Sequence, residues 1–165
     1  MENEKGRLLQ ILRFELAGQS YAFDVRKTRE VLSLVKMTPL PGARDFLSGV
    51  INLRGSVIPV VDLRRKFSLP VEADTVDTSI VIVELENEGE LAVIGAVVDS
   101  VKGVLSCDDA DLEAAPRFGM KLNASLIQAI AKKDGAFIII LDPSKVFSEK
   151  ELWLVEDAPA ASFPS

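Results

Sequence analysis

The sequence predicts an all-β protein built from short strands. Val and Ile are concentrated in short apolar runs, and turn residues such as Gly, Asn and Asp separate these runs. Only brief segments suggest helix. A chain of 165 residues fits one domain or two very small ones. About ten short strands with few helical pieces are typical of a small barrel or a sandwich.

The first third of the chain is expected to form a hairpin and then a third strand. Residues 12–16 alternate in polarity, residues 17–20 have the composition of a turn, and a second strand begins at residues 21–23. Residues 25–34 are interpreted as a short helical turn that passes into a strand. After a Pro- and Gly-containing break, residues 43–47 are expected to form one helical turn that inserts Phe46 into the core.

The next segment places an arginine on a turn between two strands. The apolar runs at residues 50–51 and 57–61 flank Asn52-Leu53-Arg54-Gly55. Asn and Gly tolerate the positive φ angles of a tight turn, and the planar fork of an arginine held there can bind carboxylates bidentately. Pro59 has no N–H to donate, so the second strand needs an edge or a bulge at that point.

The second half of the chain also consists of short strands, and it begins after a polar, turn-rich linker at residues 70–78. Strands are expected at residues 79–85, 91–98, 101–105, 126–131 and 137–141, with a tight turn at Asp134-Gly135 and a long irregular connection over residues 106–120. Asp142-Pro143-Ser144 can start a C-terminal helix, whose apolar stripe extends to about residue 155. The Ala- and Pro-rich residues 156–165 are expected to be a disordered tail.

The linker near residue 75 divides the strands into two comparable sets, although the sequence shows no clear repeat. Two very small barrels that share an interface would explain a core that neither could build alone. Barrels of this size are filled by their own side chains and leave no ligand cavity. Function is therefore expected on the surface.

Composition argues against several classes of function. The net charge of −6 and the pI near 4.8 disfavour general affinity for nucleic acid or for an anionic membrane. No apolar run approaches the roughly 18 residues of a membrane-spanning helix, and the polar N-terminus is unlike a secretory signal, so a cytoplasmic protein is expected. The single cysteine, Cys107, cannot form an internal disulfide.

The usual catalytic and metal-binding patterns are missing from the sequence. It has no histidine, which removes the commonest general base, and it has no Gly-rich phosphate loop. The acidic cluster Asp108, Asp109, Asp111 and Glu113 lacks EF-hand spacing, so a solvated loop is favoured over a calcium site. Two aspartates beside Cys107 disfavour its thiolate. No cofactor and no metal are expected, although a carboxylate-based enzyme stays open.

A nucleic-acid-binding barrel is a weaker alternative. Small barrels bind single strands with exposed aromatic residues and a positive groove. Arg54, Arg64, Arg65 and Lys66 would supply the charge, but only 6% of the residues are aromatic and the chain is acidic overall.

Many ordered segments resemble the CheW family of chemotaxis coupling proteins. The resemblance covers about residues 8–150. It is carried by Tyr21-Ala22-Phe23-Asp24-Val25, Glu30-Val31, Pro39-Leu40-Pro41, Gly49-Val50-Ile51-Asn52-Leu53-Arg54-Gly55, Ile58-Pro59-Val60-Val61-Asp62-Leu63, Val97-Val98-Asp99-Ser100-Val101, Ala115-Pro116, Asp134-Gly135 and Ile140-Leu141-Asp142.

The resemblance implies a single CheW-like domain over residues 1–165, made of two intertwined five-stranded SH3-like barrels. The first barrel would span residues 20–78, and the second would combine residues 1–19 with 79–150. Such a protein is a non-enzymatic adaptor that joins the regulatory domain of the histidine kinase CheA to methyl-accepting chemoreceptors, in arrays beneath the membrane. It would bind no nucleic acid and would not insert into the membrane. An adaptor of a non-motility chemosensory pathway is the alternative.

The resemblance also implies a receptor-binding groove between the barrels. Its residues would be Thr28, Glu30, Gly49, Asn52, Arg54, Ile80 and Val81. Ile80 and Val81 would supply apolar contact with a receptor helix hairpin, while Arg54 and Glu30 would set its register. For Gly49, Asn52 and Val81, the alternative is a role in the core or in the turn. For Arg54, the alternative is that it pairs with Glu30 across the groove and only holds the two elements together. The chain departs from the family pattern at Thr28, where a larger apolar residue is frequent, and at Ala129, where Gly is common.

Overall fold

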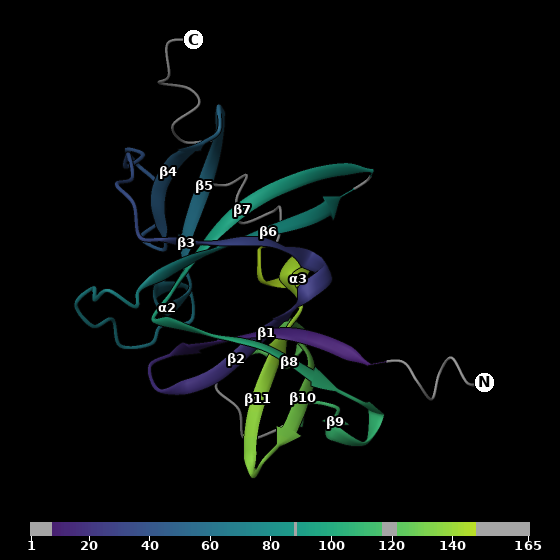
Figure 1. The fold of residues 1–165 in the computed structure, drawn as a ribbon. Coiled ribbons are helices and arrows are strands. Elements are labelled where there is room, and N and C mark those ends of the chain that lie inside the picture. Colours follow the sequence, from purple (N-terminus) through teal and green to yellow (C-terminus); the bar gives the residue numbers. More distant parts are fainter. Residues whose placement is uncertain (1–7, 88, 117–121, 148–165) are drawn as a thin grey trace.

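The computed structural model describes residues 8–87, 89–116 and 122–147, and it confirms the all-β fold class (Figure 1). The strands are β1 (Leu9–Leu16), β2 (Gln19–Asp24), β3 (Thr28–Ser33), β4 (Leu47–Leu53), β5 (Ser56–Asp62), β6 (Ser79–Asn87), β7 (Glu90–Val98), β8 (Ser100–Cys107), β9 (Leu112–Glu113), β10 (Ile127–Lys133) and β11 (Ala136–Leu141). Single helical turns connect them: η1 (Val25–Lys27), α2 (Leu63–Lys66), η2 (Asp109–Asp111), η3 (Ala124–Leu126) and α3 (Pro143–Val146).

Five strands form one sheet in the order β3-β6-β7-β5-β4. Beyond β3, the chain returns to the opposite edge, where Thr38 and Val50 exchange two backbone hydrogen bonds of 2.9 Å. This bridge joins the segment that follows β3 to β4 and closes the sheet into a barrel, which we call the five-stranded barrel. Pro59 lies in the part of β5 that pairs only with β4, so its missing N–H leaves no gap in a central ladder.

The other strands form a sheet in the order β8-β1-β2-β11-β10-β9, which we call the six-stranded barrel. Its outer strands β8 and β9 are joined through the single turn η2. The N-terminal hairpin β1–β2 sits in the middle of this sheet, between β8 and β11 (Figure 1). The first and last strands of the chain therefore share one barrel.

The two barrels have the same topology with a permuted chain order. Strands β3, β6, β7, β5 and β4 correspond to β8, β1, β2, β11 and β10. Each barrel has one parallel pair, β5 with β7 and β11 with β2. The bulge in β4 near Gly49 corresponds to the bulge in β10 near Ala129. The structure thus contains the internal repeat that the sequence does not show.

The strand pairing divides the chain differently from the expected boundaries of 20–78 and 79–150. β6 and β7 lie in the second expected segment, yet they pair with β3 and β5 in the five-stranded barrel. β2 begins at Gln19 but pairs with β1 in the six-stranded barrel. The reason is that, among β3, β4 and β5, only β4 and β5 form a ladder with each other. β6 and β7 are needed to connect β3 to this hairpin in one sheet.

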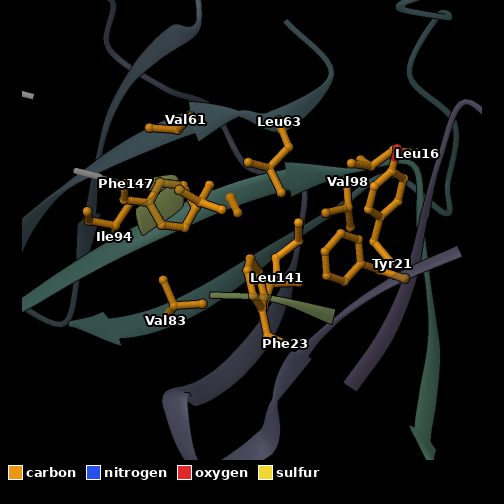
Figure 2. Packing of buried hydrophobic residues seen from close by; sticks show 14 of the residues in the cluster. Leu16, Tyr21, Phe23, Val61, Leu63, Val83, Ile94, Val98, Leu141 and Phe147 are labelled. Carbon is orange, nitrogen blue, oxygen red and sulfur yellow. The ribbon is translucent and has the colours of Figure 1, made fainter. Parts of the chain in front are cut away.

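Three clusters of buried side chains follow from this arrangement. One cluster fills the five-stranded barrel and includes Ile58 and Ile80, and another fills the six-stranded barrel and includes Ile11 and Ile138. The main cluster lies between the barrels, where Phe23, Val83, Leu141 and Phe147 point toward one another from both sheets (Figure 2). The expected shared core is this main cluster.

Local expectations were met except at three places. Residues 43–47 form no helix, because Phe46 reaches the core from a turn, and its C=O accepts the Asp62 N–H at 2.7 Å. The connection over residues 106–120 contains η2 and β9, which pairs with β10. Residues 17–20 contribute only a two-residue turn. The expected helix begins as α3, but its continuation and the tail at 156–165 lie outside the described residues.

Candidate functional site

The turn between β4 and β5 holds Arg54 in a left-handed backbone conformation. Arg54 has a φ of 51° and Gly55 a φ of 90°, as in the two-residue hairpin turns that match the twist of antiparallel strands. The Asn52 side chain accepts the Gly55 N–H at 2.9 Å, which stabilises the turn. Asn52 itself belongs to β4, so it is Arg54 rather than Asn52 that adopts the positive φ.

The guanidinium of Arg54 forms an ion pair with the carboxylate of Glu30 on β3. A second contact joins Arg54 Nη1 to Glu30 Oε1 at 3.5 Å. The Glu30 carboxylate raises the pKa of Arg54, through the hydrogen bond and through its charge. The Arg54 side chain is nevertheless 67% exposed. The pair therefore connects the outer strands of the five-stranded barrel and remains accessible from outside.

Gly49 lies in β4 where the chain after β3 passes closest. Its φ is 149°, and a Cβ added there would lie 2.4 Å from the backbone oxygen of Thr38. Only glycine fits beside the Thr38–Val50 bridge that closes the barrel. Gly49 therefore has a structural role.

Two of the expected groove residues, Ile80 and Val81, have no exposed surface. They lie on opposite faces of β6, and both faces are covered because Ile80 points into the five-stranded barrel and Val81 into the main cluster. The expected apolar contact with a partner helix through these side chains is therefore wrong for this conformation. Thr28 is half-buried, and its hydroxyl donates to the Val25 C=O at 2.9 Å, closing η1.

A depression that the sequence reasoning did not find lies where η1, the β6–β7 hairpin and α3 meet. It has a volume of about 340 Å³ and is lined by Arg26, Lys27, Leu85, Leu91 and Ser144, with two glutamates of β6. Leu91 is 67% exposed. Because η1 leads into β3 through Thr28, the depression adjoins the same strand that carries Glu30. No pattern in the sequence brings these distant segments together.

A second feature that was missed is a buried ion network around Arg64. Its side chain is 4% exposed and contacts the carboxylates of Asp62 and Asp99, each at 2.9 Å. These bonds raise the pKa of Arg64, with Asp62 the main cause. Asp74 is a third, more distant partner, with its Oδ1 at 3.8 Å from Nη2. A buried guanidinium that is paired with carboxylates is not available to a phosphate, which weakens the nucleic-acid interpretation of this basic run. The sequence signal that could have predicted this network is the spacing Asp-x-Arg at Asp62 and Arg64, directly after a predicted strand.

The acidic loop and the cysteine have structural roles. Asp108 and Asp111 form a capping box around η2, and Asp111 and Glu113 pair with Lys133 and Lys132. Cys107 is fully buried, and its pKa is raised mainly by burial, with the neighbouring aspartates contributing less. Within the described residues, no group of three or more acidic, cysteine or histidine side chains is arranged to hold a metal ion.

No helix in the described part of the chain has the length and hydropathy to cross a membrane.

The family model of the CheW-like domain matches residues 10–151 of this chain. The chain belongs to the CheW-like family. Curated CheW-like relatives include the chemotaxis protein CheW of Klebsiella aerogenes, 32% identical over 148 residues that cover 90% of this chain and 87% of that protein. The chemotaxis protein CheW of Thermotoga maritima is 34% identical over 143 residues, which cover 85% of this chain and 88% of that protein.

A solved CheW-like structure has the same fold. The scaffolding protein TtCheW from Thermoanaerobacter tengcongensis superposes with a TM-score of 0.77 and is 32% identical, covering 88% of this chain and 96% of that chain. Family membership identifies this chain as a non-enzymatic chemotaxis scaffold. The resemblance inferred from the sequence segments is confirmed.

Proposed function

We propose that this protein is an adaptor that couples methyl-accepting chemoreceptors to the regulatory domain of the histidine kinase CheA, in the cytoplasm at receptor arrays. Membership in the CheW-like family supports the proposal. The exposed Arg54–Glu30 pair, held by a stabilised turn, is the observation in this chain that carries it.

The proposed receptor site runs along β3. Arg54, Glu30 and Asn52 form its polar end, and Thr28 leads to the depression beside η1. In place of the buried Ile80 and Val81, Leu91 offers apolar surface to a receptor helix. The charged end orients the helix, and the apolar end supplies contact area. Hydrophobic strand surfaces of the barrels are proposed to bind the kinase.

The proposal is tested by pull-down and calorimetry with a CheA regulatory domain and with a receptor tip fragment. We expect both partners to bind at micromolar concentration. If neither binds, the proposed coupling function is wrong.

Arg54→Ala tests the site itself. Loss of a partly exposed, hydrogen-bonded charge is expected to weaken receptor binding about tenfold, or about 1.4 kcal/mol, while the free energy of unfolding changes by less than about 1 kcal/mol. Lys132→Ala is the matched control, because Lys132 also pairs with a surface carboxylate, on the other barrel. A large loss of stability without a change in affinity would assign Arg54 to bracing the barrel only.

A further inference from the structure

The two barrels have matching strand-to-helix junctions, and the second residue of the helical turn is an arginine in one and a serine in the other. β5 runs into α2 through Asp62, and β11 runs into α3 through Asp142. Each aspartate accepts the backbone N–H two residues later, at 3.0 Å from Arg64 and at 3.1 Å from Ser144. Given the shared topology, Ser144 occupies in one barrel the position of Arg64 in the other.

At the first junction, Arg64 connects the two barrels. Its Nε and Nη2 atoms donate to Asp62, and its Nη1 donates to Asp99 Oδ1, all at 2.9 Å. Asp99 lies between β7 and β8, where the chain leaves the five-stranded barrel for the six-stranded one. Its Oδ2 accepts the Ala17 N–H in the β1–β2 turn at 2.7 Å, and its own N–H donates to the Glu15 C=O at 3.0 Å.

At the second junction, no comparable link is formed by the corresponding side chains of the described residues. The Ser144 hydroxyl donates only to Asp142, and the depression of about 340 Å³ lies beside it. Arg26 repeats the Asp-x-Arg geometry with Asp24, at 3.2 Å from Nε and 2.7 Å from Nη2, but its side chain is 81% exposed and bonds to Asp24 alone. Polar bonds of Arg64 thus connect the two barrels at the first junction. Ser144 and Arg26 make no such connection at the second.

We propose that Arg64 is a positioning residue that fixes the angle between the two barrels. Apolar packing in the main cluster is non-directional, whereas a planar guanidinium satisfies two carboxylates only in a narrow range of geometries. Orientations that separate Arg64 from Asp99 leave the buried Nη1 of Arg64 without this acceptor, while the bonds to Asp62 remain, so these orientations are disfavoured. Under the proposed adaptor function, on which this second step rests, the same angle sets the geometry in which two partners are held.

The angle is measurable without any partner. Spin labels at Ser56→Cys and Gln128→Cys, both exposed positions on different barrels, report the inter-barrel distance by pulsed EPR in a Cys107→Ala background. We expect Arg64→Met to widen the distance distribution at least about twofold. Arg26→Met is the matched control, because it removes an arginine of the same local geometry without a partner in the other barrel, and it should leave the distribution unchanged.

Asp99→Asn keeps the experiment decisive if Arg64→Met fails to fold. Arg64 and Ala17 donate to different oxygens of Asp99, and the asparagine amide has an NH2 group, which cannot accept, in place of one of them. One of the two bonds is therefore lost, while the Arg64–Asp62 pair stays intact. This variant should also widen the distribution. An unchanged mean and width in Asp99→Asn, or in both folded variants, overturns the proposal.

The consequence for assembly is tested separately with the regulatory domain and the receptor fragment. Each binary affinity of Asp99→Asn should stay within about twofold, while the cooperative ternary complex weakens about tenfold, a change typical of coupling between two sites. Equal loss in binary and ternary binding would overturn the role in partner geometry. If the wild-type protein binds neither partner, the proposed function fails, but the EPR result still decides the role of Arg64.

Discussion

At the residue scale, Gly49 and Gly55 show how the same residue type meets two different requirements. Both have positive φ, but only Gly49 faces backbone at a distance that excludes a Cβ, whereas Gly55 has open space around it. The sequence indicated Gly55 through its turn composition. It did not distinguish a structural from a receptor-binding role for Gly49, because the close approach of Thr38 comes from a segment that pairs only in the folded barrel.

Alanine at the two glycines should separate these effects. Gly55→Ala is expected to cost about 1 kcal/mol of unfolding free energy, from the backbone conformation alone. Gly49→Ala should lower the unfolding free energy by at least about 3 kcal/mol. The strain of a positive φ adds to a clash between the new Cβ and the backbone of Thr38. Urea denaturation of both variants measures the difference. Equal costs would mean that β4 and residues 38–39 can move apart freely.

Cys107 gives a second residue-scale prediction. Because the thiol is fully buried and its pKa is raised by burial, it should not react with a disulfide reagent such as DTNB in the native protein at pH 8, and it should react fully in denaturant. The reaction is followed by absorbance. Rapid labelling of the native protein would show that β8 opens locally on that timescale.

At the element scale, the helical turns depend on aspartate caps at the ends of strands. Asp24 and Asp62 each end a strand, Asp142 directly follows one, and all three cap the turn that follows. The sequence predicted the helix start after β11 from its aspartate and proline, and the turn after β2 from the spacing of apolar and charged residues rather than from its cap. It wrongly predicted a helix at 43–47, where no side-chain cap precedes the turn and tertiary hydrogen bonding decides the conformation.

The Asp24 cap should make stability depend on pH. Burial raises the pKa of Asp24, but the hydrogen bonds and charge of Arg26 outweigh it, so the pKa is lowered on folding. A carboxyl group whose pKa is lowered on folding stabilises the protein at pH values above its pKa in the unfolded state, which is near 4. This stabilisation is lost as the pH falls through the pKa of the folded state.

Asp24→Asn should therefore be less stable than the wild type by about 2 kcal/mol at pH 7, with the gap shrinking below about pH 4. Chemical denaturation across this pH range measures the gap. Asp134→Asn, at an exposed turn, is the matched control for an Asp-to-Asn substitution away from Arg26. A gap that stays constant down to pH 2 would contradict the assigned cause.

β6 explains why part of the candidate site was mistaken. Its run Ser79–Asn87 begins with consecutive apolar residues, the pattern of a strand that is covered on both faces. The expectation that Ile80 or Val81 contacts a partner assumed one open face. Two different cores cover the two faces, and the second core exists only because the barrels pack together.

At the scale of the whole molecule, the main cluster joins the two barrels through a shared core. It draws Phe23 and Leu141 from the six-stranded barrel and Val83 and Ile94 from the five-stranded barrel (Figure 2). The N-terminal hairpin also completes the barrel that the C-terminal strands begin (Figure 1). The five-stranded barrel is continuous in sequence from β3 to β7, whereas the six-stranded barrel combines the N-terminal hairpin with β8–β11. Each barrel has a small cluster of its own and shares the main cluster with the other.

Phe23→Ala should reveal this coupling. Removing a fully buried ring at the interface is expected to cost about 3–5 kcal/mol and to accelerate hydrogen exchange in the most protected strands of both barrels equally. Phe137→Ala, at a side chain that is 58% exposed, should change stability by less than about 0.5 kcal/mol. Loss of protection in the six-stranded barrel alone would show that the barrels unfold independently.

The sequence by itself determined the strands, most turns, the exposed arginine turn and the family, because these depend on local alternation, turn residues and ordered segments. Only the tertiary structure decided which strands share a barrel, that Ile80 and Val81 are covered, and that Arg64 joins the barrels while Ser144 does not. The physical reason is that these features depend on contacts between residues far apart in the chain. Alternation places a side chain on a face of a strand, but packing alone decides what covers that face.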